Sequence, residues 1–149
     1  MFVRATLLLI YPMAAMVLLT FVVLLHLFRS RVRAVRDGQL TTKYYRVFQG
    51  ESEPETTIKP ARHFVNLFEA PTLFYVGCLA AMVSGDYGLV LLVIAWLYVV
   101  ARIAHAWIHL GGNRVRHRMR VYFLGWVILL ALWVHVVVHV ITVRMILAG

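Results

Sequence analysis

The chain alternates between four long apolar stretches and three polar connections. The apolar stretches run over residues 5–28, 63–83, 87–110 and 121–143. Each is long enough to cross the hydrocarbon core of a bilayer, which takes about 20 residues of α-helix. The polar connections cover residues 29–62, the short turn 84–86 and residues 111–120. This pattern predicts an all-α integral membrane protein, a four-transmembrane-helix bundle in a single domain over residues 1–149.

Composition and charge placement support a membrane protein over a nucleic-acid-binding one. Hydrophobic residues make up 62% of the chain, against about 45–50% in soluble domains. Of the 15 Lys and Arg residues, twelve lie in connections 29–62 and 111–120, and the turn 84–86 has none. The positive-inside rule then predicts that these two connections are cytoplasmic and that both termini are on the non-cytoplasmic side. Because anionic lipid headgroups account for this charge, we expect the bilayer as partner and no nucleic acid.

Polar residues recur at helical spacing on one face of the second and third stretches. They are Arg62, Asn66 and Glu69 on the second and Tyr98, Arg102, His105 and His109 on the third. The turn Ser84-Gly85-Asp86 folds the two stretches into a hairpin, so residues whose numbers sum to about 171 lie at equal depth. Glu69 is then level with Arg102. By the same rule Asn66 is level with His105, and Arg62 with His109. The matching depths predict one polar site.

Two charges at equal depth in a membrane are predicted to pair. A charge at mid-membrane costs about 2.5–3.5 kcal/mol on insertion scales, so a Glu69–Arg102 ion pair is the economical arrangement. A purely structural role for this pair is the alternative, but it leaves Arg62, Asn66 and the histidines unexplained. Pro71 follows closely and is expected to free a backbone carbonyl near the site.

The third connection adds an arginine stripe. If the fourth helix begins there, Arg114, Arg118 and Tyr122 share one face at i, i+4 and i+8. An inward arginine stripe beside buried histidines predicts a receptor for a small anion. On the fourth stretch, His135 and His139 have the spacing of half a metal site, but no carboxylate or cysteine is expected near them, so no metal site is predicted.

The connection 37–60 is long and contains the aromatic residues Tyr44, Tyr45 and Phe48. Aromatic side chains favour a segment that packs down at the membrane surface. A lid over a site and a plain surface loop are both compatible with this pattern.

Three motifs stand in order along the chain. Arg62 precedes Asn66-Leu67-Phe68-Glu69 and Pro71; Arg102-Ile103-Ala104-His105 precedes Leu110-Gly111; and Arg118 follows that glycine, with Tyr122 one turn later. Together, in this order and at this spacing, they make the chain resemble the MAPEG family, the membrane-associated proteins of eicosanoid and glutathione metabolism. The resemblance covers essentially the whole chain. It is strongest to a bacterial branch with Asn-Leu-Phe-Glu-x-Pro and His-Leu-x-x-Asn-Arg-Val, which implies a bacterial inner membrane.

The resemblance implies a homotrimer that binds glutathione as cosubstrate at the cytoplasmic side, between subunits. The residues carried over as glutathione ligands are Arg62, Asn66, Glu69, His105, Arg118 and Tyr122, with Arg29 or Arg31 from a neighbour. Arg118 matches the arginine that stabilises the thiolate and is the expected catalytic residue. Arg102, His109 and Arg114 complete the expected polar site.

The chain departs from the prostaglandin-synthase branch at three positions. His109 stands where that branch has a tyrosine, Val65 where it has an arginine, and Met119 where a small hydroxyl residue follows the key arginine. Eicosanoid substrates are therefore not carried over. The expected function is a glutathione-dependent transferase or peroxidase acting on small hydrophobic electrophiles. The alternative is a non-catalytic trimer that binds a lipid headgroup, another small anion or a partner membrane protein.

Overall fold

The computed structural model describes residues 7–50, 52–86 and 88–148, and every regular element in these ranges is helical. The elements are the 3-10 helix η1 (Leu7–Leu9) and the helices α2 (Ile10–Arg36), α3 (Tyr44–Val47), α4 (Glu55–Asn66), α5 (Ala70–Val83), α6 (Leu89–Leu110) and α7 (Val115–Ala148). Four helical segments are long and apolar enough to cross a membrane, with α4 and α5 counted as one. The prediction of an all-helical protein with four such segments is confirmed.

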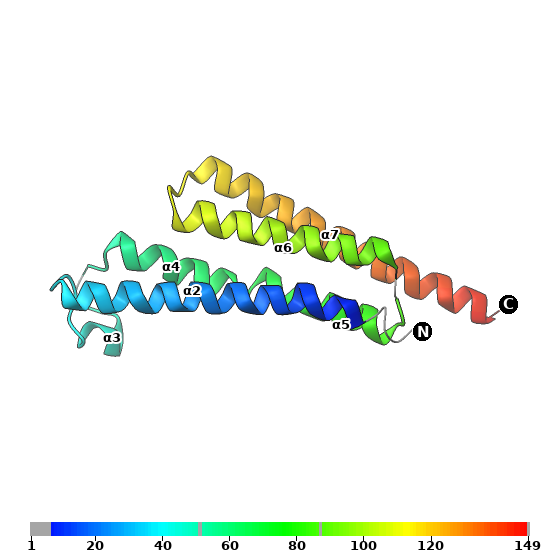
Figure 1. Cartoon of the computed structure of the whole chain (residues 1–149), viewed down its shortest axis with the longest axis horizontal. Coiled ribbons are helices and arrows are strands. Elements are labelled where there is room, and N and C mark those ends of the chain that lie inside the picture. Colours follow the sequence, from blue (N-terminus) through cyan, green and yellow to red (C-terminus); the bar gives the residue numbers. More distant parts are fainter. Residues whose placement is uncertain (1–6, 51, 87, 149) are drawn as a thin grey trace.

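The helices run nearly parallel to one long axis (Figure 1). Helices α4 and α5 follow one another as a single broken rod beside α2, and α6 and α7 form an antiparallel hairpin that packs on them. The α6–α7 turn and α3 lie toward one end of the bundle, which we call the basic end. The first turn of α2, the last turns of α7 and the end of α5 lie toward the opposite end.

The helices extend beyond the apolar stretches of the sequence. Helix α2 continues to Arg36, and α4 already begins at Glu55, so much of the predicted connection 29–62 is helical. Likewise, α7 begins at Val115, inside the predicted connection 111–120. Hydropathy marks only where a helix is apolar, whereas a helix satisfies its own backbone hydrogen bonds and continues into polar surroundings.

The second membrane segment is broken between Asn66 and Ala70. Pro71 lies at the start of α5; it has no N–H, and its ring would clash with the carbonyl four residues earlier in a continuous helix. Glu69 precedes α5 with φ −87° and ψ −94°, outside the helical region. The break frees carbonyl groups at the level of the polar residues, as the sequence predicts from Pro71.

The core is apolar and closely packed. The Phe74 and Tyr98 rings stack with centroids 4.6 Å apart and an interplanar angle of 15°. Gly77 lets α7 approach α5, because a Cβ atom there would lie 2.5 Å from Leu132 Cδ2. The Trp133 indole Nε1–H donates to the Leu73 carbonyl at 3.2 Å and ties the same two helices together.

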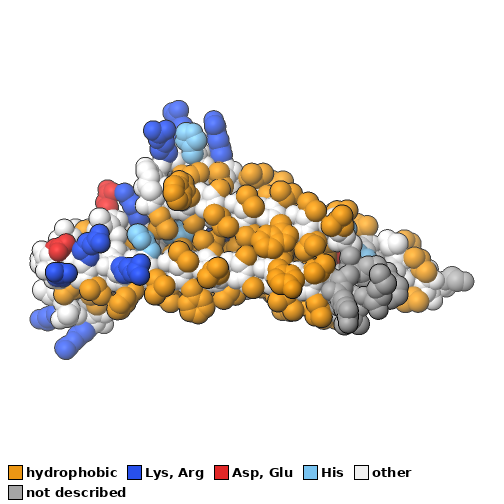
Figure 2. Space-filling model, in the orientation of Figure 1, with side chains coloured by type: hydrophobic (Ala, Val, Ile, Leu, Met, Phe, Trp, Pro, Cys, Tyr) orange, Lys and Arg blue, Asp and Glu red, His pale blue; other side chains and the backbone are white. Residues whose placement is uncertain are grey.

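The surface has an apolar body and one charged end. Figure 2 shows hydrophobic side chains along the length of the helices, with Lys and Arg gathered toward the basic end. Apolar outer faces and four membrane-length helices make this an integral membrane protein in contact with a lipid bilayer.

The connection between α2 and α4 packs against α2. Tyr44 is buried with Ala34 and Leu40, and the Arg31 guanidinium lies 5.3 Å from the Tyr45 ring centroid and 5.5 Å from that of Phe48. Helix α3 lies on the side of α2 away from α6 and α7 (Figure 1). Within one chain, this segment therefore does not cover the face between α4 and α7.

Candidate functional site

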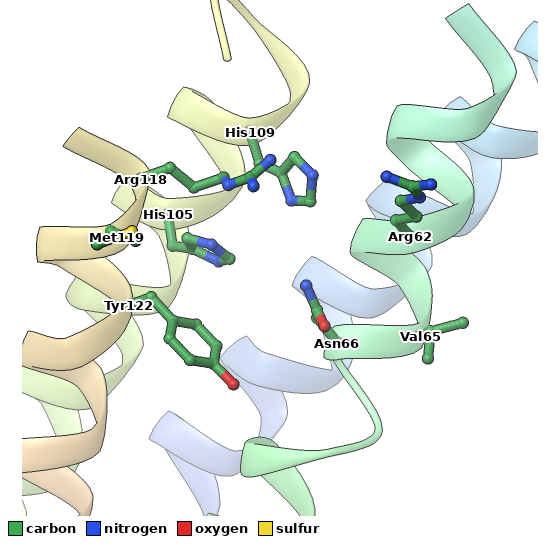
Figure 3. A pocket seen from close by; sticks show the side chains of 8 residues that line it. All are labelled: Arg62, Val65, Asn66, His105, His109, Arg118, Met119 and Tyr122. Carbon is green, nitrogen blue, oxygen red and sulfur yellow. The ribbon is translucent and has the colours of Figure 1, made fainter. Parts of the chain in front are cut away.

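A pocket of about 430 Å³ lies between α4 on one side and α6 and α7 on the other (Figure 3). Its lining residues are Arg62, Val65, Asn66, His105, His109, Arg118, Met119 and Tyr122. Five of these residues, Arg62, Asn66, His105, Arg118 and Tyr122, are among the six glutathione ligands that the family resemblance implies.

Helical spacing brings these side chains into the pocket. Arg62 and Asn66 are one turn apart on α4, His105 and His109 are one turn apart on α6, and Arg118 and Tyr122 are one turn apart on α7. The three stripes face one another because α6 packs against both α4 and α7. The His105 and Tyr122 ring centroids are 5.5 Å apart, which joins the α6 and α7 walls.

Arg102 lies behind the pocket and does not pair with Glu69. Its side chain is 1% exposed, and its Nη2 donates to the backbone carbonyl of Asn66 at 3.1 Å. No ion pair joins Arg102 to Glu69 among the described residues, so the predicted pair is wrong. The cause is the helix break: it leaves Glu69 exposed and offers Arg102 the freed carbonyl of Asn66 instead.

Three histidines form a buried cluster beside the pocket. His63 Nδ1 lies 3.1 Å from His109 Nδ1, and the His105 ring centroid lies 5.3 Å from that of His63 and 5.6 Å from that of His109. Two Nδ1 atoms at this distance share one proton, because one nitrogen must donate and the other accept. His63 is fully buried and does not line the pocket, but it packs behind two lining residues, His105 and His109.

His63 is not among the residues predicted for the site, although the sequence carries a signal for it. His63 and His109 have numbers that sum to about 172, so the equal-depth rule that matched the other polar residues also pairs these two. The helical spacing that groups Arg62, Asn66 and Glu69 does not include His63, which lies one residue off that stripe.

The Arg118 guanidinium is held by a neighbouring turn. Its Nη1 donates to Asn113 Oδ1 at 2.7 Å, and the guanidinium lies beside the His109 ring in Figure 3. Asn113 lies in the α6–α7 turn with φ 45°, in the left-handed region that asparagine tolerates better than most residues. The side chain of Arg118 is therefore pre-oriented at the pocket wall.

The pocket lining is suited to an anion. Arg62 and Arg118 supply two guanidinium groups, and the amide of Asn66 and the hydroxyl of Tyr122 can donate as well. Among the described lining residues none is a carboxylate. Charge-assisted hydrogen bonds from such a donor set recognise carboxylates, phosphates and thiolates.

Several predicted site residues lie outside this pocket. Glu69 and Arg114 are exposed and do not line it. Arg31 lies over the aromatic rings of its own α2–α4 connection, and Arg29 lies on an exposed face of α2. A single chain therefore brings neither of these last two arginines to the pocket.

A second polar cluster lies at the opposite end of the bundle. Asp86 is 3% exposed, and its Oδ2 lies 3.0 Å from His135 Nε2 and 4.0 Å from His139 Nδ1. The expectation that no carboxylate lies near these histidines is wrong, because the α5–α6 turn folds Asp86 back onto α7. Among the described residues, no group of three or more His, Cys, Asp or Glu side chains is arranged to hold a metal ion.

The order of these motifs and the pocket they form match a known family over most of the chain. The model of the MAPEG family matches residues 9–138. The chain belongs to the MAPEG family. Membership in the MAPEG family indicates a function related to glutathione or eicosanoid metabolism. No curated protein and no solved structure matches this chain.

Proposed function

We propose that this MAPEG protein binds glutathione in the pocket between α4, α6 and α7 and uses its thiolate on hydrophobic electrophiles or peroxides. The observation that carries the proposal is the convergence of Arg62, Asn66, His105, Arg118 and Tyr122 on one cavity. These residues come from three helices, and the resemblance assigns all five to glutathione. Glutathione carries two carboxylates, which suit a pocket lined by two guanidinium groups.

Arg118 is the proposed catalytic residue. A free thiol has a pKa of about 8.5, and lowering it by two units takes about 2.7 kcal/mol. A guanidinium in a partly dehydrated pocket stabilises the thiolate by charge and by hydrogen bonding. Arg118 is half-buried and pre-oriented by Asn113, so it meets both requirements.

Two reactions follow from a bound thiolate. In conjugation, the sulfur forms a bond to an electrophilic carbon, and the leaving group departs with the bonding electron pair. In peroxide reduction, the sulfur attacks the peroxide and cleaves its O–O bond; a second glutathione then releases the first as glutathione disulfide, leaving an alcohol and water. In both reactions the pocket orients the sulfur and supplies a positive field.

We further propose that the functional unit is a homotrimer in a bacterial inner membrane, with the pocket at the cytoplasmic side and both termini on the other side. The charge bias toward the basic end supports this orientation. Arg29 or Arg31 of a neighbouring subunit would complete the pocket, since neither reaches it within one chain.

The pocket also favours a second candidate, the binding of a lipid headgroup phosphate or another small anion without chemistry. Glutathione carries an ammonium group, yet no carboxylate is among the described lining residues, and Glu69 is exposed outside the pocket lining. A phosphate has no such group and needs only the donors that are present. A phospholipid that co-purifies at this site, with no binding of thiols, would support this candidate.

The proposal is tested by turnover in detergent or in vesicles. Wild-type protein is given glutathione with a hydrophobic aryl halide and, separately, with an organic hydroperoxide. We expect turnover that Arg118→Ala removes and Arg116→Ala retains, because Arg116, two residues earlier, is exposed and does not line the pocket. Full turnover in Arg118→Ala would remove Arg118 from the mechanism.

A further inference from the structure

The α6–α7 turn contains a residue that contacts both helices of one pocket wall. The backbone N–H of Asn113 donates to the Ile108 carbonyl at the end of α6 at 2.9 Å. Its side-chain Oδ1 accepts from Arg118 Nη1, on the first turns of α7, at 2.7 Å. One residue therefore links the helix that carries His105 and His109 to the helix that carries Arg118.

We infer that Asn113 is a positioning residue for Arg118, which it holds with the guanidinium directed at the pocket. This inference rests on the proposed function, in which Arg118 contacts the thiolate of glutathione. Asn113 contacts no other pocket residue through its side chain in the described hydrogen bonds, and it is not itself in the pocket lining. Its effect on the ligand therefore passes through Arg118.

The physical basis is the freedom of an arginine side chain. Arginine loses much rotamer freedom when a ligand fixes it, and a guanidinium that is already fixed loses less on binding. The Asn113 hydrogen bond is short and involves a charged donor, which places it among the stronger hydrogen bonds of proteins. It uses only one of five N–H groups, so the others remain for an anion.

Asparagine suits this position for two independent reasons. The backbone has φ 45°, which asparagine and glycine tolerate better than most residues. The short side chain carries an acceptor without a charge, so it holds Arg118 and leaves the positive charge of the guanidinium available. Asn113→Gly removes the acceptor and keeps the turn, whereas Asn113→Asp keeps both the acceptor and the turn.

The first experiment measures how freely Arg118 moves. Phenylglyoxal, which modifies arginine, is applied to the protein in detergent, and the modification rate of Arg118 is followed by mass spectrometry with Arg116 as internal reference. We expect Asn113→Gly to raise the Arg118 rate several-fold and Asn113→Asp to leave it near the wild-type rate. Gly112→Ala is the matched control in the same turn, because a Cβ there meets nothing within 4 Å.

The second experiment measures glutathione affinity by calorimetry. We expect about tenfold weaker binding for Asn113→Gly, with an unchanged melting temperature, and wild-type binding for Gly112→Ala. An unchanged Arg118 modification rate in Asn113→Gly would overturn the inference, as would a raised rate with unchanged glutathione affinity. If wild-type protein binds no glutathione, the proposed function fails, and the modification rates alone decide whether Asn113 holds Arg118.

Discussion

The Nη2–H of Arg102 donates a hydrogen bond to the backbone carbonyl oxygen of Asn66, with 3.1 Å between nitrogen and oxygen. Asn66 is the last residue before the break in the second membrane segment. In a continuous helix that carbonyl would accept from the Ala70 N–H, but the chain is non-helical between Asn66 and Ala70, and the Arg102 guanidinium donates to it instead. The charge of Arg102 is thus fixed behind the pocket, where it adds to the positive field of Arg62 and Arg118. The helix break and the buried arginine form one structural unit.

Because Arg102 satisfies the Asn66 carbonyl at the helix break, we predict that Arg102→Met destabilises the protein. The substitution keeps a long, flexible side chain but leaves the Asn66 carbonyl unpaired in a buried place, which costs about 1–3 kcal/mol. The measurement is the melting temperature in detergent, with the exposed Arg116→Met as control. A melting temperature equal to or above that of the wild type would contradict the role assigned to Arg102.

The buried pair of histidines predicts a difference between two substitutions of His63. His63→Leu leaves His109 Nδ1 without its partner, whereas His63→Asn places a polar atom near the position of the lost Nδ1. We expect His63→Leu to lower the free energy of unfolding by about 1–3 kcal/mol, and His63→Asn to lower it less. Equal losses in thermal unfolding would show that the hydrogen bond to His109 does not matter.

The close approach of α5 and α7 predicts that Gly77→Ala is destabilising. The added Cβ would lie 2.5 Å from Leu132 Cδ2 and 3.4 Å from the Trp133 ring. Overpacking of this kind costs about 1–3 kcal/mol, and the flexible end of Leu132 favours the lower value. Combining Gly77→Ala with Leu132→Ala should cost less than the two single changes added together. Strict additivity in a double-mutant cycle would argue against a direct clash.

The polar site could be predicted largely because helical spacing and a single turn set the depth of each residue. The rule that numbers sum to about 171 anticipated that Arg62, Asn66, His105 and His109 would share one pocket, and they do. It failed for Glu69 because it assumes a continuous helix, whereas the chain is broken before Pro71. A helical wheel cannot follow a side chain through non-helical backbone.

The remaining contacts depend on turns, which spacing alone does not describe. Asn113 reaches Arg118 because the α6–α7 turn places the Asn113 side chain within hydrogen-bonding distance of the Arg118 guanidinium. Asp86 reaches His135 because the α5–α6 turn folds back onto α7. Both contacts join residues on different elements through a turn conformation. Neither follows from the apolar pattern that predicts the four membrane helices.

We propose that the pocket binds glutathione as its thiolate. The most direct measurement is calorimetric titration of the detergent-purified protein with glutathione, together with an ultraviolet scan for thiolate absorbance. We predict binding in the millimolar range or tighter, with a thiolate signal that disappears in Arg118→Ala because the stabilising guanidinium is gone. Absence of binding at millimolar glutathione would contradict the account and point to a different anion in the pocket.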